Sequence, residues 1–98
     1  MNRLLGLLGL GARAGNVALG VDAVRRGLQR DEFACVVVAA DASPRTIEKV
    51  VRLARGRQVD VVRGPAADEI GAQLGRPPVM AAGVRDRALA DGIRQTVS

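Results

Sequence analysis

The side chains that this sequence offers for chemistry are mostly arginines. Lys and Arg number 15 against 10 acidic residues, which gives a net charge of +5 and a pI near 11.2. Every basic residue except Lys49 is an Arg, whose planar guanidinium suits phosphates and guanine edges. The sequence therefore favours a nucleic acid as the partner. The alternative is a solvated surface on a protein that happens to be rich in Arg.

Several other classes of chemistry lack the residues that they need. The chain has no His and one cysteine, Cys35, so we expect no His-based catalysis, no Cys/His metal site and no disulfide within the chain. Phe33 is the only aromatic residue, which disfavours domains that stack unpaired bases on aromatic side chains. We therefore expect neither an enzyme nor a cofactor, and a nucleic acid held through its phosphates and groove shape.

The glycines near the N-terminus allow two interpretations. Gly9, Gly11 and Gly15 approach the spacing of a dinucleotide-binding turn, but the spacing is one residue too long and no clear strand precedes it. An amphipathic helix with Leu4 and Leu8 on its inner face, ended by Gly15, explains the same residues. A signal peptide is a further alternative; without one we expect a cytoplasmic chain. No apolar run is long enough to cross a membrane.

Hydrophobic periodicity predicts the elements that must position the arginines. The first helix ends at Gly15, and further helices are expected at residues 21–30, 44–57, 66–74 and 86–95. Strands are expected at 17–19, 33–40, 60–62 and 79–84. The order αβαβαβαβα predicts an α/β fold, a three-layer α/β/α sandwich with a four-stranded mixed sheet. A length of 98 residues fits one domain, 1–98, and nothing requires more than a monomer.

Individual positions within these elements also carry expectations. Cys35 lies in a continuous apolar run and is expected in the core, as is Met80. In the last helix, Ala88, Leu89 and Ile93 are expected to face inward.

Several segments in a fixed order connect the chain to a known family. They read LLGLGARAG near the start, GVDAVRR at 20–26, VVVAADASP at 36–44, and the pieces Ile70-Gly71, Leu74-Gly75 and RPPV within 70–79. With these segments the chain resembles the L-seven-Ae family of ribosomal and kink-turn RNA-binding proteins, close to its small bacterial YlxQ-type members. The resemblance implies an α/β/α sandwich that binds structured RNA without catalysis, in the ribosome or the translation apparatus, with RNA and ribosomal proteins as partners.

The resemblance also implies a binding surface made of two segments. The N-terminal part of the second helix would enter the widened groove of kinked RNA, and the loop before the last strand would cover the flipped nucleotide. Physical chemistry agrees, because a helix N-terminus attracts phosphate and two prolines stiffen a loop. The expected RNA-binding residues are Gly20, Val21, Asp22, Ala23, Arg25, Arg26, Arg30, Asp41, Arg76, Pro77, Pro78 and Val79.

The chain departs from the family pattern at two positions of the helix segment. The family usually reads Gly-x-Asn-Glu-x-x-Lys, whereas Asp22 and Ala23 replace the Asn and Glu here, and Arg26 keeps the cation. No cation precedes Gly20 in residues 16–19. These changes favour an alternative, a protein-interaction adaptor on the same fold. Asp22 allows two interpretations: its carboxylate contacts an RNA base, or it forms an ion pair with Arg26, four residues later in the helix.

A second basic cluster is expected on the third helix. It comprises Lys49, Arg52, Arg55 and Arg57, and a solvated face is the favoured interpretation.

Overall fold

The computed structural model describes residues 2–97, and within them five helices alternate with four strands. The helices are α1 (Arg3–Arg13), α2 (Val21–Gln29), α3 (Pro44–Gly56), α4 (Ala67–Gln73) and α5 (Arg87–Gln95). The strands are β1 (Val17–Leu19), β2 (Cys35–Val38), β3 (Asp60–Arg63) and β4 (Ala81–Val84). The predicted order of elements is confirmed.

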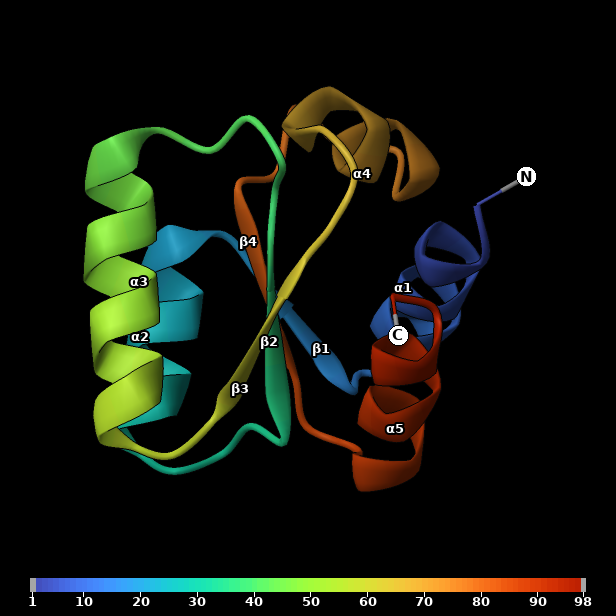
Figure 1. Cartoon of the computed structure of the whole chain (residues 1–98). Helices are drawn as coiled ribbons and strands as arrows, with labels where there is room; N and C mark the ends of the chain where they lie inside the picture. The colour runs from blue at the N-terminus through green and yellow to red at the C-terminus, as the bar shows by residue number, and fades with distance from the viewer. Residues whose placement is uncertain (1, 98) are drawn as a thin grey trace.

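The strands form one mixed sheet in the order β1-β4-β2-β3. Strand β4 pairs antiparallel with β1 and β2, while β2 and β3 run parallel. Figure 1 shows α2 and α3 on one face of the sheet, α1 and α5 on the other, and α4 across one end. The predicted three-layer sandwich is therefore confirmed, with β1 as an edge strand.

The register brings four loop junctions to one end of the sheet. Leu19 pairs with Ala82, while Val38 pairs with both Ala81 and Arg63. Strands β1, β2 and β3 therefore end where β4 begins, and we call this the upper end, since it lies at the top of Figure 1. The opposite, lower end holds the starts of β2 and β3 and the end of β4. Segments far apart in the sequence meet at each end.

Two strands are shorter than the sequence predicts. The Val79 N–H donates to the Ala67 carbonyl of α4 at 3.0 Å instead of to a neighbouring strand, so β4 begins at Ala81. The Ala40 N–H likewise donates to the Pro65 carbonyl at 2.9 Å, and β2 ends at Val38. Backbone hydrogen bonds to loops and to α4 therefore trim both strands.

The core confirms most of the predicted inner faces. Cys35 is fully buried, as expected, together with side chains such as Leu8, Leu28 and Ile93. Ala88 is exposed, however, and Ala90 is buried in its place. Ala88 lies five positions before Ile93, which turns it well away from the inner face of a helix with 3.6 residues per turn.

The dinucleotide-turn interpretation of the N-terminal glycines is wrong. Gly9 and Gly11 lie inside α1 and are buried, and a Cβ at Gly11 would lie 2.6 Å from the Val17 side chain. Their role is close packing of α1. Gly15 follows the helix with a φ of +76°, as the helix-end interpretation predicts. No helix within residues 2–97 combines the length and apolar character that a bilayer span requires.

Candidate nucleic-acid interface

A cleft of about 320 Å³ opens at the upper end, between the β1–α2 junction and the segment that leads into β4. It is lined by Leu19, Gly20, Val21, Arg76, Pro77, Pro78, Val79 and Met80. The cleft thus brings together six of the residues that the sequence predicts for RNA binding, from two segments far apart in the chain. Its lining contains a cation and no acidic side chain.

One wall of the cleft is the start of α2, which has no side-chain cap. Gly20 occupies the N-cap position with a φ of +100°, a backbone conformation that favours glycine, and its N–H donates to the Ala81 carbonyl at 2.9 Å. By contrast, Asn2, Ser43 and Asp86 cap α1, α3 and α5 with their own side chains. The N–H groups of the first turn of α2 therefore face outward with a partial positive charge, which favours an anion.

The remaining predicted residues of α2 lie outside the lining of the cleft. Asp22 is exposed on the first turn, and Ala23 is half-buried. Arg26 and Arg30 are exposed further along the helix, and Arg25 is half-buried.

The charged side chains among these α2 residues are not used by the fold for polar contacts within residues 2–97. None of the three arginines has an ion pair or side-chain hydrogen bond there, and the pair between Asp22 and Arg26 does not form. Three guanidinium groups therefore remain available along one helix.

The other wall is a loop held firmly against α4. The Arg76 N–H donates to the Gly71 carbonyl at 2.9 Å, and Val79 is bonded to Ala67 as described above. A Cβ at Gly71 would lie 2.7 Å from the Pro77 carbonyl carbon, so only glycine allows this approach. Because the loop is already ordered, binding would cost it little conformational entropy.

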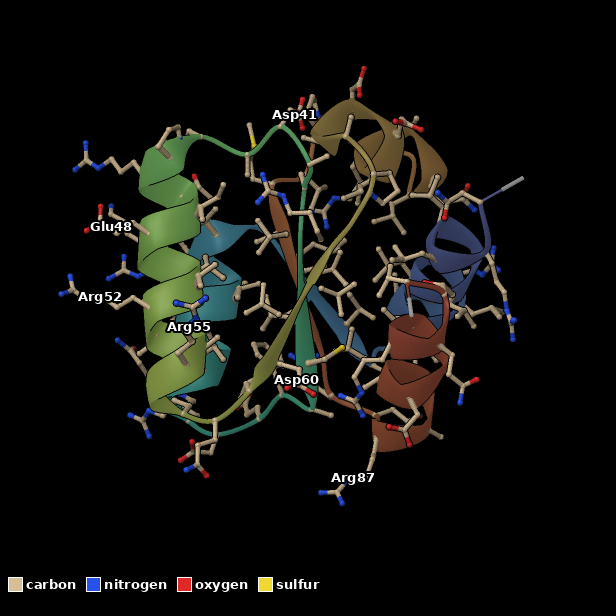
Figure 2. The ribbon with its side chains drawn as sticks, viewed as in Figure 1. Asp41, Glu48, Arg52, Arg55, Asp60 and Arg87 are labelled. Atoms are coloured by element: carbon tan, nitrogen blue, oxygen red, sulfur yellow. The ribbon has the colours of Figure 1, made fainter. Side chains whose placement is uncertain are left out.

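Asp41 lies at the upper end, as predicted, but its carboxylate contacts protein backbone. Its Oδ1 accepts a hydrogen bond from the Ala67 N–H at 2.8 Å, at the start of α4 (Figure 2). The Ala67 carbonyl in turn accepts from Val79. Asp41 does not line the cleft. Its hydrogen bond stabilises the start of α4 and, through α4, the loop at residues 76–79.

The sequence interpretation missed part of this surface. Leu19 lines the cleft, and so does Met80, which is half-buried where full burial was expected. A second hollow of about 370 Å³ shares Leu19 and Arg76 with the cleft. We call it the α1 hollow, and its other lining residues are Gly9, Ala12, Arg13, Gln73 and Leu74. No sequence signal marks Arg13, because its place beside Arg76 depends on how α1 packs against α4.

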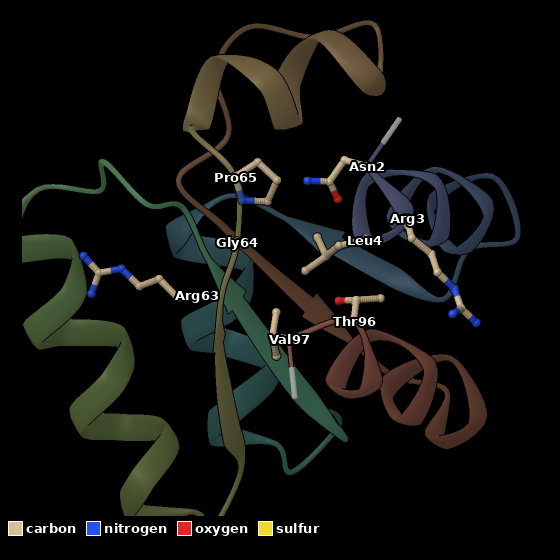
Figure 3. A pocket seen from close by; sticks show the side chains of 8 residues that line it. All are labelled: Asn2, Arg3, Leu4, Arg63, Gly64, Pro65, Thr96 and Val97. Atoms are coloured by element: carbon tan, nitrogen blue, oxygen red, sulfur yellow. The ribbon is translucent and has the colours of Figure 1, made fainter.

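Another pocket, of about 440 Å³, lies between the start of α1 and the chain around Gly64 (Figure 3). Its two arginines, Arg3 and Arg63, point away from it in Figure 3. Arg63 instead donates to the Ala40 carbonyl at 3.2 Å. This pocket contains none of the predicted binding residues.

The second basic cluster, on α3, is partly neutralised within the chain. Arg52 pairs with Glu48 at 3.7 Å, and Arg57 pairs with Asp31 at 3.2 Å. Figure 2 shows Glu48, Arg52 and Arg55 on the outer surface of α3. This arrangement agrees with the solvated-face interpretation.

The lower end of the sheet carries the other ion pairs. Arg85 pairs with Glu32 at 3.8 Å. Arg94 pairs with Asp60 at 3.5 Å, also pairs with Asp91, and donates to the Ala34 carbonyl. Cys35 is buried beside this group, and its burial raises the pKa of the thiol to about 11. The thiol is therefore a protonated core group.

Solved structures share the fold of this chain. A protein of unknown function from Bacillus halodurans has a TM-score of 0.92 and 24% identity, over 98% of this chain and 97% of its own. The 15.5 kD RNA-binding protein of Giardia lamblia has a TM-score of 0.76 and 24% identity, over 96% of this chain and 81% of its own. At these identities the likeness concerns the fold alone.

Comparisons of sequence give a second, independent result. No curated protein matches this chain. A sequence model of one family does match, and it spans residues 2–93, which include every element of the cleft and most of α5. The chain therefore belongs to the Ribosomal protein L7Ae/L30e/S12e/Gadd45 family.

Proposed function

We propose that this chain is a non-catalytic RNA-binding protein that contacts structured RNA through the upper-end cleft and the exposed face of α2. The observation that carries the proposal is a cleft lined by an uncapped helix start and a rigid loop, with a cation and no acid. Membership of a ribosomal-protein family supports it, as does the fold shared with a Giardia protein described as RNA binding.

The chemistry of the surface suggests how each part would contact RNA. A phosphate fits against the first-turn N–H groups of α2, because the helix dipole attracts an anion and Gly20, which has no side chain, lets it come close. Arg26 and Arg30 would follow the backbone from there, with Arg25 beside them. Val21, Arg76 and the loop from Pro77 to Val79 would contact the other side of the kink.

The substitutions at two positions predict reduced selectivity for kinked RNA. Asp22 can accept a hydrogen bond from a guanine N–H but cannot donate one, and Ala23 can do neither. The loss of one good base contact costs about 1–3 kcal/mol. We therefore propose binding to kink-turn-like RNA in a ribosomal or translational context in the cytoplasm, by a monomer, with much of the affinity coming from phosphates.

The test is a titration of a labelled kink-turn RNA and of a plain duplex of equal length, each at two salt concentrations. The label belongs on the RNA, because the protein has no Trp or Tyr to report binding. We expect binding that weakens with salt and a preference for the kinked RNA. An absence of binding to both RNAs at low salt would contradict the proposal.

The first variant to test is Arg26→Ala, with Arg87→Ala as the matched control. Both side chains are exposed arginines without an ion pair within residues 2–97, but Arg87 lies at the lower end (Figure 2). We expect Arg26→Ala to weaken binding and to reduce the slope of log K against log salt by about one. The control should leave both unchanged. Equal behaviour of the two variants would exclude this face of α2.

The second candidate function is a protein-interaction adaptor. Ala23 and the absence of cations in residues 16–19 favour it, because the base-reading contacts of the family are reduced. A pull-down with and without nuclease separates the two functions. A protein partner retained after nuclease treatment supports the adaptor, whereas loss of all partners supports RNA binding.

A further inference from the structure

The α1 hollow continues the cleft beyond the two predicted segments. The two depressions share Leu19 and Arg76 in their linings, so they lie next to each other on the surface. The lining of the α1 hollow includes the apolar side chains of Ala12 and Leu74 together with the guanidinium of Arg13. No acidic side chain lines it.

The two arginines of this hollow are free to bind a ligand. Arg13 and Arg76 are exposed, and neither has an ion pair or a side-chain hydrogen bond within residues 2–97. Arg13 lies in the last turn of α1, where the helix dipole favours a cation. Two unpaired guanidinium groups in one hollow suit a phosphate.

We propose that the RNA backbone leaves the cleft across the C-terminal end of α1, with one phosphate held between Arg13 and Arg76. This inference rests on the proposed function and adds Arg13 and the α1 hollow to the binding surface. Arg76 borders both depressions, so one side chain can serve both parts of this surface. An acidic protein segment is the competing occupant, and the experiment below distinguishes it.

The test compares Arg13→Ala with Arg3→Ala, an exposed arginine at the other end of the same helix. With the kink-turn RNA at low salt, we expect Arg13→Ala to weaken binding several-fold to tenfold. The salt slope should fall by about one for Arg13→Ala and by about two when Arg76→Ala is added. Arg3→Ala should match the wild type, and all variants should keep the wild-type unfolding temperature, because these side chains are exposed.

The outcomes separate this inference from the proposed function. If Arg26→Ala weakens binding while Arg13→Ala matches Arg3→Ala, the α1 path is wrong and the cleft remains. If the wild type binds neither RNA, both fail. If Arg13→Ala weakens only a nuclease-resistant protein complex, the α1 hollow takes an acidic protein instead of RNA.

A tethered cleavage reagent gives a second measurement. Ala14 is exposed next to Arg13, so Ala14→Cys can carry the reagent, while the buried thiol of Cys35 stays unmodified. Glu48→Cys, exposed on α3 on the opposite side of the sheet (Figure 2), is the control. We expect cuts in the bound RNA strand near the kink from Ala14→Cys and none from Glu48→Cys. Equal cutting from both positions would overturn the proposed path.

Discussion

The two ends of the sheet use their arginines in opposite ways. At the lower end, Arg57, Arg85 and Arg94 each pair with an acidic side chain, at 3.2, 3.8 and 3.5 Å. Around the upper-end cleft and the adjoining α1 hollow, Arg13 and Arg76 have no such partner within residues 2–97. These three lower-end arginines support the fold through their ion pairs, whereas the two arginines of the cleft and the α1 hollow are available to a ligand.

The loops explain this difference. The lower-end turns contain Asp31, Glu32 and Asp60, which sit directly beside helix ends that carry arginines. The turns that form the cleft contain glycine and proline instead. Two other acids of the upper end, Asp41 and Glu69, accept hydrogen bonds from backbone N–H groups at the start of α4, at 2.8 and 3.4 Å. They therefore stabilise the scaffold of the cleft.

The largest expected effect comes from Gly71→Ala, which would break the upper end. The added Cβ would collide with the backbone at Arg76 and Pro77, so the loop must move away from α4. We expect a loss of about 2–3 kcal/mol in the free energy of unfolding, measured with denaturant, and weaker RNA binding. Gly6→Ala is the control, because nothing lies within 4 Å of its Cβ and Ala favours a helix. A Gly71→Ala protein with wild-type stability and affinity would show that the loop needs no support from α4.

A smaller effect is expected from Arg94→Met, which would break the lower end. The substitution removes the pairs with Asp60 and Asp91 and the hydrogen bond to the Ala34 carbonyl. We expect a loss of about 1–2 kcal/mol in the free energy of unfolding, with unchanged RNA affinity. Arg76→Ala should instead weaken RNA binding and leave the free energy of unfolding unchanged. A loss of affinity in Arg94→Met would contradict the division between the two ends.

The smallest effect is expected at Asp41. We expect Asp41→Ala to cost about 1 kcal/mol of stability, because the Ala67 N–H loses its acceptor. Asp41→Asn should retain most of it, since the amide oxygen also accepts a hydrogen bond. Thermal unfolding gives the stability of both variants, and RNA titration gives their affinity. If both variants lost affinity equally at unchanged stability, the carboxylate would contact RNA directly.

Much of the fold could be predicted from local patterns. The apolar run around Val36 to Val38 predicts a strand buried on both faces, and Ser43 with Pro44 predicts the start of α3; both are confirmed. The predictions were less accurate where backbone groups bond outside the local element. The N–H of Val79 bonds to α4, which no periodicity reveals, and the predicted fourth strand was two residues too long at its start.

The sequence by itself determined the sandwich and the excess of arginine, because hydrophobic period, turn residues and charge are local properties of the chain. The two segments that form the cleft were indicated by the resemblance of the sequence to the family. Only the tertiary structure decided which arginines are neutralised, that Asp41 supports α4, and that Arg13 stands beside Arg76. These outcomes depend on packing between elements far apart in sequence, since an ion pair or a hollow exists only where folding brings its members within contact distance.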